Sequence, residues 1–217
     1  MNRAWFFGDS FTAGTGIEIE TEYYKEFGPG SKFTSIIAER FNSEEINLGE
    51  PGCCNLTILS RVLNELEHIK VGDTVVVGNT SPLRDLVPSK DRSKLIDQKL
   101  FDSKPYRDSL AFGNKELSQL LINYCISIKD SNIELWNSFY VSMFLGLVRY
   151  FNSRDIKSLL WDYSVWSEEI SPGMKFENIK EHSVGKYYDL HGSFNGHREV
   201  ASWIIGGLEK STIFLNK

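Results

Sequence analysis

Short apolar runs alternate with amphipathic segments in the first part of the chain. Residues 4–7 are all apolar and residues 74–77 contain three consecutive valines, which is typical of strands buried on both faces. Residues 46–48 mark a shorter strand between them. Residues 31–42, and the segment after Asn55 as the expected N-cap, repeat apolar residues every three or four positions and predict helices. This alternation predicts parallel βαβ units and an α/β fold.

The later part of the chain is less regular. Residues 133–136 are expected to form a fourth strand, and residues 139–151 a buried helix, because large apolar residues recur there every three or four positions. A last helix is expected over about residues 195–208. Residues 161–188 contain clustered aromatic residues without a clear period, and we expect irregular structure there with the aromatic side chains used for packing.

The pattern breaks down over residues 83–113, which are rich in charged and turn-forming residues. A stretch of this length inside a compact domain is usually functional or mobile. We therefore expect a single domain over residues 1–217 with a pocket-side insertion at about 83–113. A solvated insertion without a role is the alternative.

The composition is that of a globular protein, with 41% hydrophobic and 24% charged residues among 217. The net charge of −5 and the lack of a dense run of Lys and Arg argue against a nucleic-acid partner. No apolar run reaches the roughly 18 residues of a membrane span. A strand expected by residue 4 leaves no room for a signal peptide, so we expect a cytoplasmic protein or one associated with a phage particle.

Three cysteines are present, and Cys53 and Cys54 are adjacent. Their number and spacing match neither a disulfide framework nor a CxxC zinc site. We expect reduced thiols.

Three predicted strands end in small polar turns, at residues 8–10, 49–52 and 78–80. Because the carboxyl ends of parallel strands lie side by side, these turns should line one crevice, where ligands of α/β proteins usually bind. Ser10 lies in the first turn. It is either a nucleophile or the N-cap of a following helix.

A nucleophilic serine needs a base, and the base needs an acceptor that orients it. Of the four histidines, His191 is the best candidate, because it follows Asp189 and precedes the last predicted helix. His197 falls one turn inside that helix, where a surface or capping role is expected. His68 ends a helix away from the crevice, and His182 lies in the irregular segment.

Four segments together resemble the SGNH, or GDSL-type, family of serine esterases and lipases. Residues 8–11 (Gly-Asp-Ser-Phe) match its first block, and residues 47–55 (Asn-Leu-Gly-Glu-Pro-Gly-Cys-Cys-Asn) resemble its second. Residues 75–80 fall where the family has its third block. Residues 189–191 (Asp-Leu-His), followed by 195–197, resemble its fifth.

The resemblance implies a three-layer α/β/α fold with a flavodoxin-like central parallel sheet. It implies that Ser10 is the nucleophile, His191 the base and Asp189 its acceptor, with the backbone N–H groups of Ser10 and Gly52 in the oxyanion hole. The implied activity is hydrolysis of a carboxylic ester through an acyl-enzyme, without a metal or cofactor. A small-molecule or glycan ester, short-chain or O-acetylated, is the favoured substrate, and a lipid or thioester is the alternative.

Two positions depart from the family pattern. The third block is usually Gly-x-Asn-Asp, whose asparagine donates to the oxyanion, but here Asn79 comes one residue early and Thr80 occupies its place. Either could be the third donor. The acid also precedes the histidine by two residues rather than three, because the expected position is Tyr188.

Two other functions stay open at this point. Ser10, Thr12 and Thr15, with Gly14 and Gly16, could cradle a phosphate as in a flavodoxin-like binder of nucleotides. The altered third block is compatible with a catalytically weak family member that binds a glycan without hydrolysing it.

Overall fold

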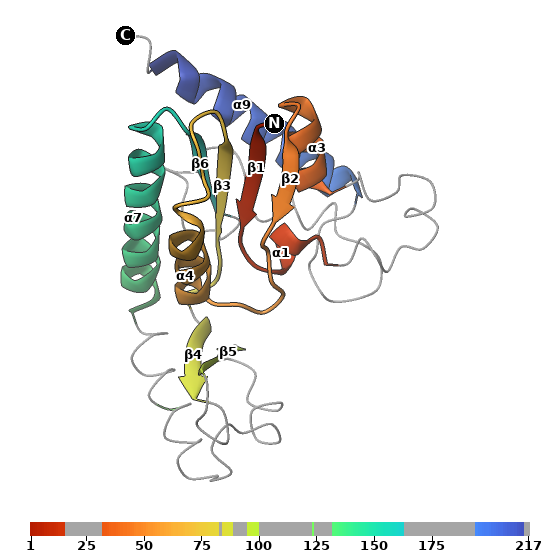
Figure 1. Ribbon diagram of the computed structural model, residues 1–217. Coiled ribbons are helices and arrows are strands. Elements are labelled where there is room, and N and C mark those ends of the chain that lie inside the picture. The colour runs from red at the N-terminus through yellow and green to blue at the C-terminus, as the bar shows by residue number, and fades with distance from the viewer. Residues whose placement is uncertain are drawn as a thin grey trace.

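A four-stranded parallel sheet forms the centre of the protein in the computed structural model (Figure 1). Its strands lie in the order β2 (Glu44–Asn47), β1 (Arg3–Phe7), β3 (Thr74–Asn79) and β6 (Lys157–Asp162), and all three pairings are parallel. The predicted α/β fold with a parallel sheet is confirmed. The structure describes residues 1–15, 32–82, 84–88, 95–99, 123, 132–162 and 194–214.

Helices cover both faces of this sheet, which makes three layers. On one face lie α4 (Asn55–Glu65) and α7 (Ile133–Asn152), and on the other lie α3 (Phe33–Arg40) and α9 (Phe194–Phe214). Successive strand residues alternate between the two layers. The core against α4 and α7 contains Trp5, Phe7, Val75 and Val77, and the core against α3 and α9 contains Ala4, Phe6 and Val76.

Residues 133–136 do not form the fourth strand that the sequence predicted, because they are the first turn of α7. Four residues are too few to distinguish the alternation of a strand from the three-to-four-residue period of a helix. The helical stripe is visible only over the whole segment, in which Asn137, Tyr140, Phe144, Val148 and Phe151 are buried. The predicted buried helix at 139–151 is confirmed and begins six residues earlier.

The fourth strand is β6, which the sequence did not predict. Its first two residues, Lys157 and Ser158, are polar, so only a short apolar run remains as a signal. Trp161 was expected in an irregular segment, but it lies in β6 with 1% of its surface exposed and packs on Phe33 of α3. The rest of that segment, residues 163–188, lies outside the described residues.

A hairpin lies beyond the carboxyl ends of the sheet strands (Figure 1). Its strands, β4 (Arg84–Pro88) and β5 (Leu95–Lys99), pair antiparallel and fall within the predicted insertion at 83–113. The only other described helix is short, α1 (Ser10–Ala13), directly after β1. Among the described helices, none combines the length and apolar character needed to cross a membrane.

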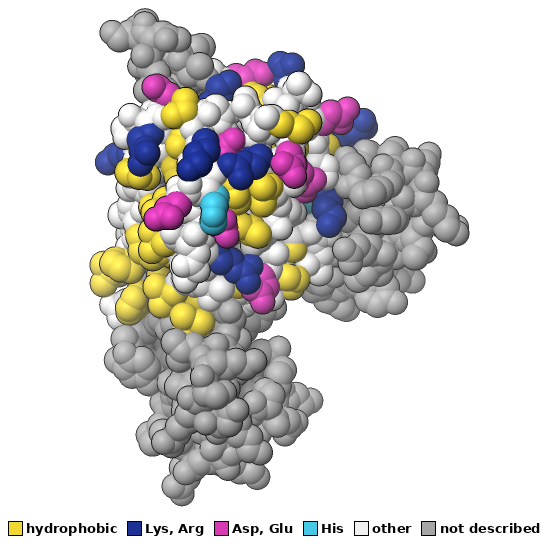
Figure 2. Space-filling view, in the orientation of Figure 1, with side chains coloured by type: hydrophobic (Ala, Val, Ile, Leu, Met, Phe, Trp, Pro, Cys, Tyr) yellow, Lys and Arg dark blue, Asp and Glu magenta, His cyan; other side chains and the backbone are white. Residues whose placement is uncertain are grey.

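Exposed apolar side chains gather over the start of α7, at one corner of the face shown in Figure 2. Leu135 is 68% exposed and Phe139 is 54% exposed, and Phe139 stacks edge-on against Trp136. Basic and acidic side chains are interspersed over the remainder of that face.

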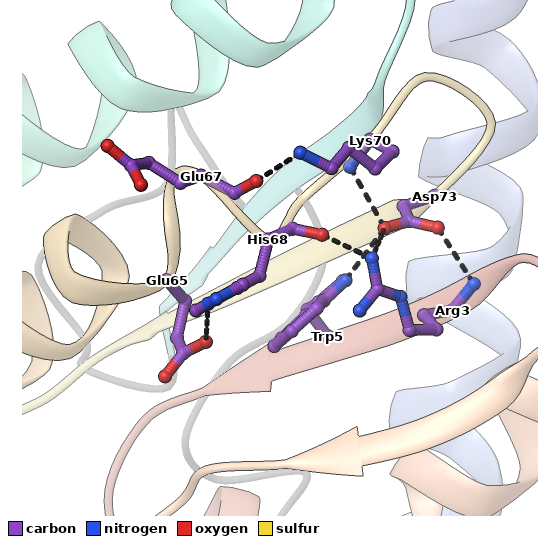
Figure 3. A network of polar contacts seen from close by, with 7 residues as sticks. All are labelled: Arg3, Trp5, Glu65, Glu67, His68, Lys70 and Asp73. Atoms are coloured by element: carbon purple, nitrogen blue, oxygen red, sulfur yellow. Dashed lines mark hydrogen bonds and ion pairs between the residues drawn. The ribbon is translucent and has the colours of Figure 1, made fainter.

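A buried carboxylate joins β1 and β3 at the amino end of the sheet (Figure 3). Asp73 accepts hydrogen bonds from Arg3 N and Trp5 Nε1, each at 2.9 Å, and from Lys70 N at 3.0 Å. The Arg3 guanidinium lies 3.4 Å from Asp73 Oδ2 and donates to the carbonyl of His68. His68 is therefore at the edge opposite the three polar turns, as predicted.

We expect Asp73→Asn to lower the free energy of unfolding by about 1–3 kcal/mol, as measured by urea denaturation. Both carboxylate oxygens accept N–H donors, so an amide in either orientation turns its NH2 group toward a donor. Asp155→Asn is the matched control. Asp155 is exposed and has a φ of 57°, which asparagine tolerates. Equal urea midpoints for the two variants would contradict a stabilising role for Asp73.

Candidate active site

Three polar turns meet at the carboxyl edge of the sheet, as the sequence predicted. We call them the Ser10 turn (residues 8–10), the Gly52 turn (residues 49–52) and the Thr80 turn (residues 78–80). The carbonyl of Gly8 accepts from Glu50 N at 3.0 Å, which joins the first two turns. Thr80 Oγ1 donates to Asp9 Oδ2 at 2.7 Å, which joins the first and third. A single hydrogen-bonded frame results.

The Ser10 turn places Ser10 as the first residue of α1, directly past the end of β1. Asp9 is the N-cap of this helix, because its Oδ1 accepts from Phe11 N at 3.0 Å. The alternative that Ser10 is the cap is therefore wrong. Ser10 is 5% exposed and Asp9 is 2% exposed, so the turn is largely covered.

Close backbone contacts fix the position of α1. A Cβ on Gly49 would lie 2.4 Å from Ala13 N and 2.8 Å from the carbonyl carbon of Thr12. Asn47 Nδ2 donates to the carbonyl of Thr12 at 2.8 Å and holds the same turn of helix from the β2 side. Because only glycine permits this approach, Gly49 determines how near β2 and α1 lie.

The Gly52 turn contains a backbone in an unusual conformation and contacts Gly8, two residues before Ser10. Gly52 has a φ of 85°, in the region that favours glycine, and no heavy atom of the described residues lies within 4 Å of the position a Cβ would take. Glycine is therefore required here by conformation, whereas the space beside it is open. The next residue, Cys53, donates from Sγ to the carbonyl of Gly8 at 3.3 Å and holds the turn against β1.

Asn55 fixes the Thr80 turn to the start of α4. Its Nδ2 donates to the carbonyl of Thr80, and its Oδ1 accepts from Thr80 N, each at 2.8 Å. The sequence predicted Asn55 as the N-cap of α4, but Cys54 holds that position and Asn55 is the first helical residue. The side chain binds across to β3 instead of capping its own helix.

Asn79 and Thr80, the two candidates for a third oxyanion donor, have different partners. Asn79 Nδ2 donates to Asn137 Oδ1 of α7 at 3.1 Å, and Thr80 Oγ1 donates to Asp9. Both residues are buried, with 1% and 0% of their surfaces exposed. A hydroxyl has one proton, so Thr80 can donate to an oxyanion only if its hydrogen bond to Asp9 is broken.

Arg84 is a member of this frame that the sequence did not single out. Its Nη1 lies 2.9 Å from Asp9 Oδ2 and 3.3 Å from the carbonyl of Cys53. Arg84 begins β4 and was grouped with the insertion at 83–113, which was expected to lie beside the pocket or else to be solvated, without a role for any single residue. The one local signal is its position in the sequence shortly after the Thr80 turn. Arg84 N donates a hydrogen bond to the carbonyl of Ser81, which closes a second turn between them.

The predicted base and acceptor, His191 and Asp189, lie outside the described residues. His197 was expected at the surface or at a helix cap. The surface position is wrong, because the residue is buried, but the side chain does contact the first N–H of helix α3. It is 3% exposed, its Nδ1 accepts from Phe33 N at 3.2 Å, and its ring stacks on Phe33 at 5.7 Å. It therefore joins α9 to α3.

The phosphate cradle proposed for Ser10, Thr12, Thr15, Gly14 and Gly16 does not match the described backbone. Gly14 N donates to the carbonyl of Phe11 at 3.2 Å and Thr15 N to the carbonyl of Ser10 at 2.9 Å, so these N–H groups close α1 instead of facing a ligand. Gly16 lies outside the described residues. Within the described ranges, no group of three His, Cys, Asp or Glu side chains is placed to hold a metal ion.

No protein-family model and no curated protein matches the chain. Solved structures do match. One is a lipolytic protein of the G-D-S-L family from Veillonella parvula, with 14% identity, 95% of this chain and 97% of that chain covered, and a TM-score of 0.43. Another is a lipase/acylhydrolase from Enterococcus faecalis, with 17% identity, 97% and 96% covered, and a TM-score of 0.42.

A third is an acetyl xylan esterase from the rumen bacterium Butyrivibrio proteoclasticus, with 13% identity and a TM-score of 0.45. It is a longer protein: 97% of this chain but only 64% of that chain is covered. The family that the sequence resembles is thus also named among the solved structures to which the chain is similar.

Proposed function

We propose that this protein hydrolyses carboxylic esters with Ser10 as the nucleophile. The observation that carries the proposal is the frame itself, in which the turn that contains Ser10, at the end of a central strand, is joined to the turn that contains Gly52 by the hydrogen bond from Glu50 N to the carbonyl of Gly8. A nucleophile at the carboxyl edge of a parallel sheet lies where substrates of α/β proteins bind. Backbone N–H groups nearby are the donors that acyl transfer requires.

The reaction follows the two steps of serine hydrolases. His191 takes the proton of Ser10 Oγ, which attacks the ester carbonyl, and the oxyanion that forms is held by the N–H groups of Ser10 and Gly52. The imidazolium, oriented by Asp189, gives the proton to the leaving alcohol. Water then attacks the acyl-enzyme by the same route and releases the acid. This scheme needs no metal or cofactor.

We propose that the two backbone donors carry the oxyanion and that Asn79 and Thr80 hold the frame. Asn79→Ala and Thr80→Val should then each lower kcat by about tenfold or less, below the roughly 10²–10³ that loss of an oxyanion donor costs. Their hydrogen bonds to Asn137 and Asp9 support this assignment. A loss of that larger size in one variant, with KM and urea midpoint unchanged, would identify its residue as a third donor.

The substrate we favour is a short-chain ester or an O-acetylated carbohydrate. The three turns that are expected to line the crevice consist mainly of small and polar residues, and this suits a small acyl group better than a long alkyl chain. Nitrophenyl esters of increasing chain length, compared with acetylated sugars and a thioester, test the preference. Highest kcat/KM for long acyl chains would favour a lipase instead.

Covalent labelling tests the function directly. The purified protein is treated with a fluorophosphonate, and the modified peptide is identified by mass spectrometry. We expect a single adduct on Ser10, formed in competition with a substrate ester. If the protein is not labelled and does not hydrolyse esters, but binds a glycan with measurable affinity, the proposal is wrong and the protein is a glycan-binding protein.

A further inference from the structure

We propose that Arg84 is a positioning residue that holds the Ser10 and Gly52 turns in register and neutralises the charge beside the nucleophile. The inference rests on the proposed ester hydrolysis and adds to it a residue outside the four segments that resemble the family. It concerns the two turns whose N–H groups are proposed to hold the oxyanion.

The first contact of Arg84 is with a carboxylate that is almost fully covered. The side chain of Asp9 is 1% exposed and that of Arg84 is 11% exposed, and their closest atoms are 2.9 Å apart. Asp9 also accepts from Phe11 N and Thr80 Oγ1. Of these three donors, only the guanidinium carries a full positive charge, so among the described contacts it is the one that balances the charge of the carboxylate.

The second contact reaches the other side of the proposed oxyanion hole. Arg84 Nη1 lies 3.3 Å from the carbonyl of Cys53, the residue that follows Gly52. One nitrogen therefore bridges the residue before Ser10 and the residue after Gly52. Loss of the bridge weakens the connection between the two turns, which are then joined through the carbonyl of Gly8 by Glu50 N and Cys53 Sγ. Misplacement of reacting groups by about 1 Å can cost roughly 10² in rate.

The charge of Asp9 gives Arg84 a second effect. Attack by Ser10 creates a negative oxyanion beside the turn that contains the buried carboxylate of Asp9, the residue before Ser10, and the two like charges repel each other. Charges interact strongly where water is excluded. The guanidinium opposes this repulsion, and its effect is larger in the transition state than in the ground state. Loss of Arg84 should therefore lower kcat more than it changes KM.

Three variants and one control test the inference. Arg84→Gln should lower kcat by about 100-fold and change KM by about threefold or less. Arg84→Lys keeps the positive charge but lacks the planar guanidinium, and its kcat should be about tenfold higher than that of Arg84→Gln. Asp9→Asn combined with Arg84→Gln removes both charges and should be more active than Arg84→Gln alone. Arg3→Gln disrupts the ion pair with Asp73 at the opposite edge and should leave kcat unchanged.

The outcomes separate this inference from the proposed function. The role of Arg84 is overturned, and the proposed function is not, if the wild-type protein is active and the folded Arg84→Gln variant has the wild-type kcat. The same holds if Arg84→Gln loses no more kcat than Arg3→Gln. Wild-type protein with neither hydrolysis nor labelling of Ser10 overturns both. Thermal melting establishes whether each variant is folded. If Arg84→Gln does not fold, Arg84→Lys decides, and a kcat equal to wild type in that variant contradicts the proposal.

Discussion

Replacing Ser10 with alanine is expected to lower kcat for ester hydrolysis by roughly 10⁴–10⁶-fold, as loss of the nucleophile does in serine hydrolases. Stability should stay within about 0.5 kcal/mol of wild type, because alanine is the best helix former and Ser10 begins α1 without acting as its cap. Activity is measured with a short-chain nitrophenyl ester, and stability by urea denaturation.

Ser60→Ala is the control for this prediction. Ser60 is exposed on α4, so the same chemical change there should leave both activity and stability unaltered. A Ser10→Ala variant that keeps the wild-type kcat would show that another group attacks the ester.

Gly49→Ala is expected to lower the free energy of unfolding by roughly 3 kcal/mol, the upper end of the range for overpacking. The added Cβ would meet Ala13 N at 2.4 Å, and a backbone atom cannot turn aside as a side chain can. Either α1 or the Gly52 turn must move. The rate of fluorophosphonate labelling at Ser10 should therefore fall as well.

Gly146→Ala provides the contrast. Gly146 lies within α7, and in the part of the chain that the structure describes no heavy atom is within 4 Å of the position its Cβ would take. Alanine there should raise stability by roughly 0.5–1 kcal/mol through helix propensity and leave labelling unchanged. If both variants have the same urea midpoint, close contact at Gly49 does not determine the position of α1.

The sequence was sufficient for those parts of the fold whose signals are local. Three consecutive valines predict β3 without reference to any partner, and a long apolar period predicts most of α7. The start of α7 was missed because four residues are too few to show a period, and β6 was missed because it opens with the polar Lys157 and Ser158. Trp161 lies in β6, and its burial depends on contact with α3, far away in the sequence.

The site shows the same division between local and distant causes. The three turns could be predicted to meet, because each directly follows a strand in a parallel sheet. The roles of Asn55, Arg84 and His197 could not, because each is set by a partner remote in the chain. Asn55 binds Thr80 25 residues away, Arg84 binds Asp9 75 residues away, and His197 binds Phe33 164 residues away.

The frame around Ser10 also has a consequence for the order in which the site is made. The hydrogen bonds that join the three turns and Arg84 connect residues between Gly8 and Arg84, whereas the proposed base is His191. The intervening chain, on the order of 100 residues, takes roughly 5–20 s to synthesise. A nascent chain therefore contains the proposed nucleophile and both proposed oxyanion donors well before it contains the proposed base, and the proposed ester hydrolysis requires that synthesis has passed His191.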